Sequence, residues 1–88
     1  MKKLTTGEVN LMKKFNITDV EAPSTTLRSN RFSGETVTLN EAAAKMYDLV
    51  ISMNDQYDSG RKINVQDFDR LRYLFAKLWS AEYMTLLD

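Results

Sequence analysis

The residues most often used in enzyme chemistry are scarce in this chain. Among its 88 residues there is no histidine and no cysteine, so an imidazole base, a thiol nucleophile and the commonest zinc ligands are absent. Carboxylates remain, and Asp48, Glu82, Asp67 and Asp69 are the candidates for an acid–base pair. Their spacing does not place any two of them about a scissile bond. We therefore expect a protein without enzymatic activity, with Asp67 and Asp69 on a solvated helix face.

One segment loosely resembles the calcium-binding loop of an EF-hand. Residues 54–68 hold several oxygen-bearing side chains, then Gly60 and later Asp67. The acidic ligand of an EF-hand follows the glycine by six residues, whereas Asp67 follows Gly60 by seven, and Arg61 and Lys62 place positive charge in between. A helix that ends at Gly60 and a second helix that begins shortly afterwards explain the same residues better. We expect no metal and no cofactor.

Arginines are the remaining residues with which the chain could recognise a ligand. Arg28, Arg31, Arg70 and Arg72, with a tyrosine or phenylalanine for stacking, could hold the phosphate and base of a small nucleotide. No glycine-rich phosphate loop accompanies them. Twelve basic residues balance twelve acidic ones, and this net charge of zero argues against binding to DNA, RNA or anionic membranes. Nucleotide binding by an oligomer stays open as an alternative function.

Hydrophobic periodicity and turn residues predict a mainly α protein with a small β-hairpin (α+β), folded as a single domain over residues 1–88. The expected elements are a short N-terminal helix, a two-stranded hairpin, two long antiparallel helices and a short C-terminal turn; they cover residues 6–15, 25–39, 41–57, 65–79 and 80–87. Ser80 is a possible cap for the last turn. An unbroken helix to residue 87 is the alternative.

Helix starts are marked by residues that accept hydrogen bonds from free backbone N–H groups. Thr5 and Glu8 have the spacing of a capping box. Asn40 and Asn64 are expected to cap the two long helices, with Thr38 as a competing start for the first of them. These local signals fix most of the predicted boundaries.

The hairpin is predicted from alternating residues on either side of a glycine-containing turn. Val37 and Leu39 are expected to face the core, and Leu27 is expected to join them from the other strand. Gly34 is free to take a positive φ at the turn. A two-stranded ribbon is not stable alone, so it must pack on the helices or on another subunit.

Large apolar side chains are numerous for so small a domain. A chain of this size buries only about 60% of its unfolded surface, so some aromatic residues should stay outside the core. Phe32 could project from the hairpin turn or fold back on it, and Trp79 could belong to the core or to the surface. With Arg31 and Tyr73, these residues are our candidates for contacts with a partner protein.

Signals for export or membrane insertion are not recognisable. No apolar stretch follows the basic residues Lys2 and Lys3, and no apolar run, with tyrosine not counted, is longer than the three residues found at 49–51. We expect no membrane partner. The absence of cysteine is compatible with a cytoplasmic protein.

The chain also resembles a group of short, uncharacterised proteins of tailed bacteriophages. The residues that carry the resemblance are Asn30-Arg31-Phe32-Ser33-Gly34-Glu35-Thr36-Val37-Thr38-Leu39, then Ala42-Ala43 and Tyr47-Asp48, then Glu82-Tyr83-Met84-Thr85-Leu86-Leu87-Asp88. They match the pattern N-x-F-S-G-x-x-V-x-L, then Y-D, then E-Y-M-x-L-L-D, over about residues 30–88. The resemblance implies a phage-encoded protein that acts in the cytoplasm of an infected bacterium or in the virion. It implies no catalytic or ligand-binding residue.

Together these observations predict a small phage-type accessory protein without enzymatic activity. We expect it to act through protein–protein contacts, as a homo-oligomer or bound to a larger viral or host partner. A nucleotide-binding oligomer and a modulator of the host nucleic-acid machinery are the alternatives.

Overall fold

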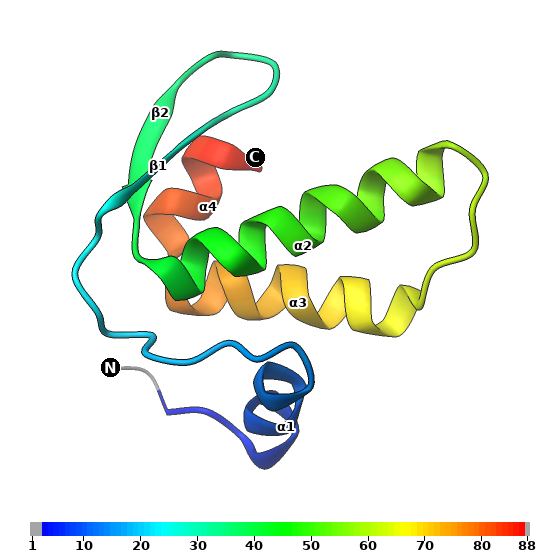
Figure 1. Ribbon diagram of the computed structural model, residues 1–88, viewed down its shortest axis with the longest axis horizontal. Helices are drawn as coiled ribbons and strands as arrows, with labels where there is room; N and C mark the ends of the chain where they lie inside the picture. Colours follow the sequence, from blue (N-terminus) through cyan, green and yellow to red (C-terminus); the bar gives the residue numbers. More distant parts are fainter. Residues whose placement is uncertain (1–2, 88) are drawn as a thin grey trace.

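The computed structural model describes residues 3–87, which form four helices and one pair of antiparallel strands (Figure 1). In chain order the elements are α1 (Thr6–Lys14), β1 (Thr26–Ser29), β2 (Thr36–Leu39), α2 (Glu41–Asp58), α3 (Val65–Leu78) and α4 (Ser80–Leu86). The predicted fold class, mainly α with a small β-hairpin, is confirmed. The helix boundaries in residues 6–78 differ from the predicted ones by no more than one residue.

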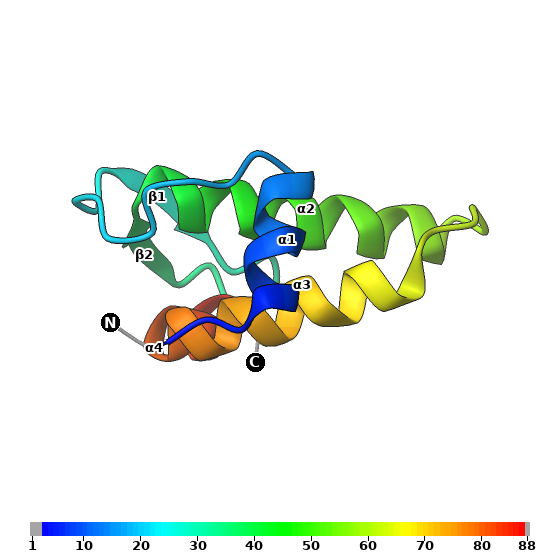
Figure 2. The same ribbon diagram turned by 90° about the horizontal axis from the view of Figure 1, so that it is seen from below.

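The two long helices α2 and α3 lie side by side and run in opposite directions (Figures 1 and 2). The hairpin packs at one end of this pair, against α2 and α4, and α1 lies against α3. The core fills the space between these elements, and its largest fully buried side chains are Phe75, Leu39, Met46, Leu71 and Leu74. None of the helices in residues 3–87 has the length and apolar character to cross a membrane.

The predicted helix caps are confirmed by hydrogen bonds. Thr5 and Glu8 form the reciprocal capping box of α1. The side chain of Asn40 accepts a hydrogen bond from the backbone N–H of Ala43 at the start of α2, so the competing start at Thr38 is not used. Asn64 caps α3 in the same way. Short-range side-chain chemistry therefore sets where three of the helices begin.

The prediction that Leu27 faces the core was wrong. Residues paired across an antiparallel ladder share one face of the ribbon. Leu27 pairs with Thr38, whereas the buried Leu39 pairs with Thr26 and the half-buried Val37 pairs with Arg28. Leu27 therefore shares the outer face of the hairpin with Thr38, and 61% of its surface is exposed.

The C-terminal segment is a separate short helix, and the alternative of an unbroken helix to residue 87 was wrong. Trp79, with φ −132° and ψ 63°, interrupts the helical backbone between α3 and α4. Its ring packs on Phe75, with 5.7 Å between ring centroids. Ser80 is the first residue of α4 and not its cap, because Trp79 takes the cap position without a side-chain hydrogen bond. The change of direction allows Leu86 to be buried in the core.

Helix α1 is attached to α3 by an ion pair at each of its ends. The Nζ atom of Lys14 lies 2.5 Å from a carboxylate oxygen of Asp67, and Nζ of Lys77 lies 2.8 Å from Oε1 of Glu8. The expectation that Asp67 lies on a solvated face was wrong, since only 7% of its surface is exposed. Packing of α1 over the start of α3 covers this carboxylate, and Lys14 compensates its charge.

Candidate functional site

Phe32 is the most exposed of the large apolar side chains in the described part of the chain. It lies in the loop between β1 and β2, and 94% of its surface is accessible to solvent. The sequence left open whether this ring projects into solvent or folds back onto the hairpin. In the structure it projects into solvent. Burying a phenylalanine side chain contributes about 1.5–3 kcal/mol, and the protein forgoes this contribution at position 32.

The loop that carries Phe32 is held in place by Asn30. The Oδ1 atom of Asn30 accepts hydrogen bonds from the backbone N–H groups of Phe32, at 2.8 Å, and Ser33, at 3.0 Å. Its Nδ2 donates to the backbone carbonyl of Thr85 in α4, at 2.9 Å. The backbone of Asn30 also closes the loop, through bonds to Glu35 and Gly34. One buried side chain therefore fixes the shape of the loop and joins it to the C-terminal helix.

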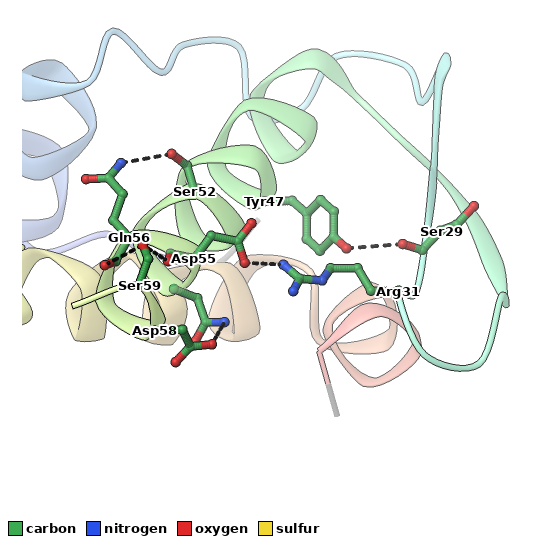
Figure 3. A network of polar contacts seen from close by, with 9 residues as sticks. Ser29, Arg31, Tyr47, Ser52, Asp55, Gln56, Asp58 and Ser59 are labelled. Atoms are coloured by element: carbon green, nitrogen blue, oxygen red, sulfur yellow. Dashed lines mark hydrogen bonds and ion pairs between the residues drawn. The ribbon is translucent and has the colours of Figure 1, made fainter. Parts of the chain in front are cut away.

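Polar contacts with α2 hold the hairpin on its other side (Figure 3). A guanidinium nitrogen of Arg31 lies 2.7 Å from Oδ1 of Asp55, and the hydroxyl of Tyr47 donates to the backbone carbonyl of Ser29 at 3.1 Å. The hydrogen bond with Asp55 raises the pKa of Arg31 above its ordinary value. Burial raises the pKa of Tyr47 above its ordinary value, because it disfavours the charged phenolate.

Beside Phe32 lies an open cleft of about 320 Å³ between the hairpin loop, α2, α3 and the C-terminal segment. Its lining is apolar apart from two asparagines and two arginines; the residues are Asn30, Arg31, Phe32, Val50, Ile51, Asn54, Phe68, Arg72, Leu86 and Leu87. The guanidinium carbon of Arg72 lies 5.8 Å from the centre of the Phe68 ring, a cation–π arrangement. The cleft therefore combines an apolar floor with positive charge at its rim.

The four residues predicted to contact a partner do not form one site. Arg31 and Phe32 lie together at the cleft. Tyr73, 71% exposed, instead lines a larger groove of about 720 Å³ between α1 and α3. Trp79 is partly buried and packs against the core. Arg72 borders both the cleft and the groove, so the two surfaces adjoin at this residue.

The four arginines considered for nucleotide binding are also dispersed. Arg28 forms a bidentate ion pair with Asp48, with 2.9 Å from Nε to Oδ1 and 2.7 Å from Nη2 to Oδ2. Arg70 lines the groove between α1 and α3 but not the cleft. Arg31 and Arg72 alone of the four line the cleft. A single phosphate would therefore meet at most two of them there.

Four of the acidic side chains in residues 3–87 are engaged with basic ones. Asp48, Asp55, Asp67 and Glu8 each pair with a lysine or an arginine. Within residues 3–87, no group of three or more metal-ligating side chains comes together. The carboxylate of Asp67, which was considered as a ligand in the EF-hand-like loop, is bound by Lys14 instead.

Asn30, which holds the loop of the candidate site, was not among the site residues predicted from the sequence. Asparagine at the first position of a turn commonly accepts hydrogen bonds from the next backbone N–H groups, so its position before Arg31 and Phe32 was a usable local signal. Its bond to Thr85 was not predictable, because the two residues are 55 positions apart. Comparison with family models, curated proteins and solved structures finds no match to this chain.

Proposed function

We propose that this chain is a small phage-type accessory protein that acts through protein–protein contacts and not through catalysis. It works as a homo-oligomer or bound to a larger viral or host partner, in the infected bacterial cytoplasm or in the virion. The contact surface is the loop of Phe32 together with the cleft beside it. The observation that carries this proposal is the 94% exposure of Phe32 on a loop fixed by hydrogen bonds.

Exposure of an aromatic ring on an ordered loop favours binding for a physical reason. A partner that covers the ring gains the burial free energy that the free protein lacks. Because Asn30 and Arg31 already hold the loop on both sides, little conformational entropy is lost when the partner binds. The origin in a tailed phage rests on the resemblance of residues 30–88 described above.

The proposal is tested by comparing the proteins retained by three tagged forms of the full chain. Wild type, Phe32→Ala and Tyr57→Ala are used as baits in lysates of infected or expressing bacteria, and bound proteins are quantified by mass spectrometry. Tyr57 is a matched control, because it is an exposed aromatic residue (62%) two positions after Asp55, and thus on the opposite side of α2.

We expect at least one protein to be retained by wild type and by Tyr57→Ala but reduced about tenfold or more with Phe32→Ala, as for a residue at an interface hot spot. All three baits should be equally folded, because both substituted side chains are exposed. Retention of the same proteins at the same level by Phe32→Ala would show that the loop is not a contact surface.

A further inference from the structure

We infer that the cleft beside Phe32 binds a peptide segment of another protein in which an apolar side chain stands next to a carboxylate. This inference rests on the proposed function and names the chemistry of the partner. It follows from the floor of the cleft, the polar groups within it, the charge at its rim and the symmetry that a second copy would impose.

The floor of the cleft fits an apolar side chain. The half-buried Ile51, Phe68 and Leu87 supply its accessible surface, over the buried Val50 and Leu86, and the exposed ring of Phe32 stands beside them. A cleft of about 320 Å³ has room for one or two side chains of an extended or helical segment. Covering this surface removes apolar area from water at about 25 cal/mol per Å².

The polar groups in the cleft do not fit a nucleobase. Both functional atoms of the Asn30 side chain are engaged, with Thr85 through Nδ2 and with Phe32 and Ser33 through Oδ1. Asn54, the other amide, donates to Asp58. A base in the cleft would therefore meet only Asn54 and Arg72 as available polar groups, and its other donors and acceptors would lie against the apolar floor, which costs about 1–3 kcal/mol for each buried group. An aliphatic or aromatic side chain carries no such cost.

The rim of the cleft fits a carboxylate. Arg31 and Arg72 line it, and none of its lining residues is acidic. Arg31 already pairs with Asp55, whereas Arg72 forms no ion pair with any carboxylate in residues 3–87. Arg72 is thus the group that would meet an Asp or Glu side chain of the partner, through charge-assisted hydrogen bonds.

A second copy of this chain fits less well than a different protein. A two-fold dimer places the same patch of each subunit against the other. Such a dimer would bring together Arg31 and Arg72 of both copies, and Asp55 offsets only the charge of Arg31. A partner with acidic residues meets the same patch with charge complementarity.

The inference is tested by selecting peptides from a random twelve-residue library displayed on yeast against the full chain. Enriched peptides are then measured by fluorescence polarisation against wild type, Arg72→Gln and Arg70→Gln. Arg70 is the matched control, because it is an exposed arginine of the same helix that lines the neighbouring groove but not the cleft. Light scattering of the unbound chain is measured in parallel.

We expect the enriched peptides to carry Asp or Glu within two residues of Phe, Leu, Ile or Trp. Arg72→Gln should weaken their binding about tenfold or more, as expected for loss of a charge-assisted pair, and Arg70→Gln should change it less than about twofold. The unbound chain should scatter as a monomer of 10.2 kDa.

Four results would overturn the inference: no enrichment, enrichment of basic or uncharged peptides, equal effects of the two arginine substitutions, or a dimer that Arg72→Gln dissociates. These results are distinguishable from failure of the proposed function. Phe32-dependent retention of a partner would uphold the proposed function even if the selected peptides lacked acidic residues or the chain proved to be dimeric.

Discussion

Asn30 and Phe32 have different roles in the hairpin loop, because Asn30 is buried and Phe32 is exposed. Phe32 offers apolar surface, and Asn30 holds the backbone that presents it. The amide of Asn30 is suited to this position because it combines an acceptor for two loop N–H groups with a donor for the carbonyl of Thr85. The structure of the loop thus depends on a side chain that is already buried in the unbound protein.

Replacement of Asn30 tests this dependence. Asn30→Ala leaves a carbonyl and two N–H groups without their partners, so we expect the free energy of unfolding to fall by about 1–3 kcal/mol in urea titrations. Asn54→Ala is the control, because that amide makes a single, exposed hydrogen bond of 3.4 Å, and it should change stability by less than about 0.5 kcal/mol. Equal losses for the two variants would contradict the assigned role of Asn30.

Glu8 gives the fold a defined pH dependence. The carboxylate of Glu8 accepts hydrogen bonds from Lys77 and from the backbone N–H of Thr5. These bonds, with that from Lys77 having the larger effect, hold the pKa of Glu8 below its ordinary value of 4.5. A depressed pKa in the folded state means that the stabilisation is present above pH 4.5 and is lost as the pH falls through the folded-state pKa. Glu8→Gln keeps an acceptor for the capping box but removes the charge that pairs with Lys77.

We expect Glu8→Gln to lower stability by about 0.5 kcal/mol at pH 7, a typical value for a partly exposed ion pair. The difference from wild type should shrink as the pH is lowered below 4.5 and the wild-type carboxylate becomes protonated. Thermal unfolding between pH 7 and pH 2.5 measures it. A difference that grows toward acid pH would contradict the ion pair with Lys77.

At the scale of the elements, glycines in two backbone conformations should respond oppositely to substitution. Gly60 ends α2 with φ +84°, a region that costs other residues about 1–2 kcal/mol. Gly7 lies inside α1, and an added methyl group there would come no closer than 4.0 Å to Oγ1 of Thr5. We expect Gly60→Ala to destabilise the protein by about 1 kcal/mol and Gly7→Ala to stabilise it by about 0.5–1 kcal/mol.

Urea denaturation of the two alanine variants measures both effects. Space around the added methyl groups is not limiting: apart from its chain neighbours, a methyl group at position 60 would meet no heavy atom within 4 Å, and one at position 7 would meet only Oγ1 of Thr5, at 4.0 Å. The opposite signs therefore report backbone conformation alone. Changes of the same sign would contradict the assigned helix end at Gly60 or the helical position of Gly7.

The elements that the sequence predicted well are those specified by neighbouring residues. The capping box of Thr5 and Glu8, and the caps Asn40 and Asn64, act over three residues, so their spacing alone locates the helix starts. Leu27 was misplaced because its face depends on the pairing register with β2, which alternation in β1 does not determine. Asp67 was misplaced because its partner, Lys14, is 53 positions away.

The difference between features set by neighbouring residues and features set by distant ones also explains how much of the candidate site was predictable. The residue types in the turn made Arg31 and Phe32 candidates for partner contact, but they left open whether Phe32 projects into solvent or folds back on the hairpin. The cleft beside them was not predictable, because it is assembled from the hairpin loop, α2, α3 and the C-terminal segment. Tyr73 and Trp79 were assigned to the same contact set by residue type, and the structure separates them from it.

At the scale of the whole molecule, the candidate contact surface exists only in the folded chain. Asn30 joins the hairpin loop to α4, and Arg31 joins it to α2, so the cleft forms when all of these elements have packed. The molecule is small, with a radius of gyration of 12.7 Å, and exposes large apolar side chains at several other positions. The central claim is that one of these positions, Phe32, is the principal contact with another protein.

A photocrosslinking scan of the exposed apolar positions tests this claim most directly. A benzophenone side chain is introduced into the full chain, one position at a time, at the residues Leu27, Phe32, Tyr57, Val65, Tyr73 and Met84, and the cells are irradiated. We expect position 32 to give the strongest protein adduct, severalfold above that at position 57. Adducts of equal yield at all six positions, or none at position 32, would contradict it.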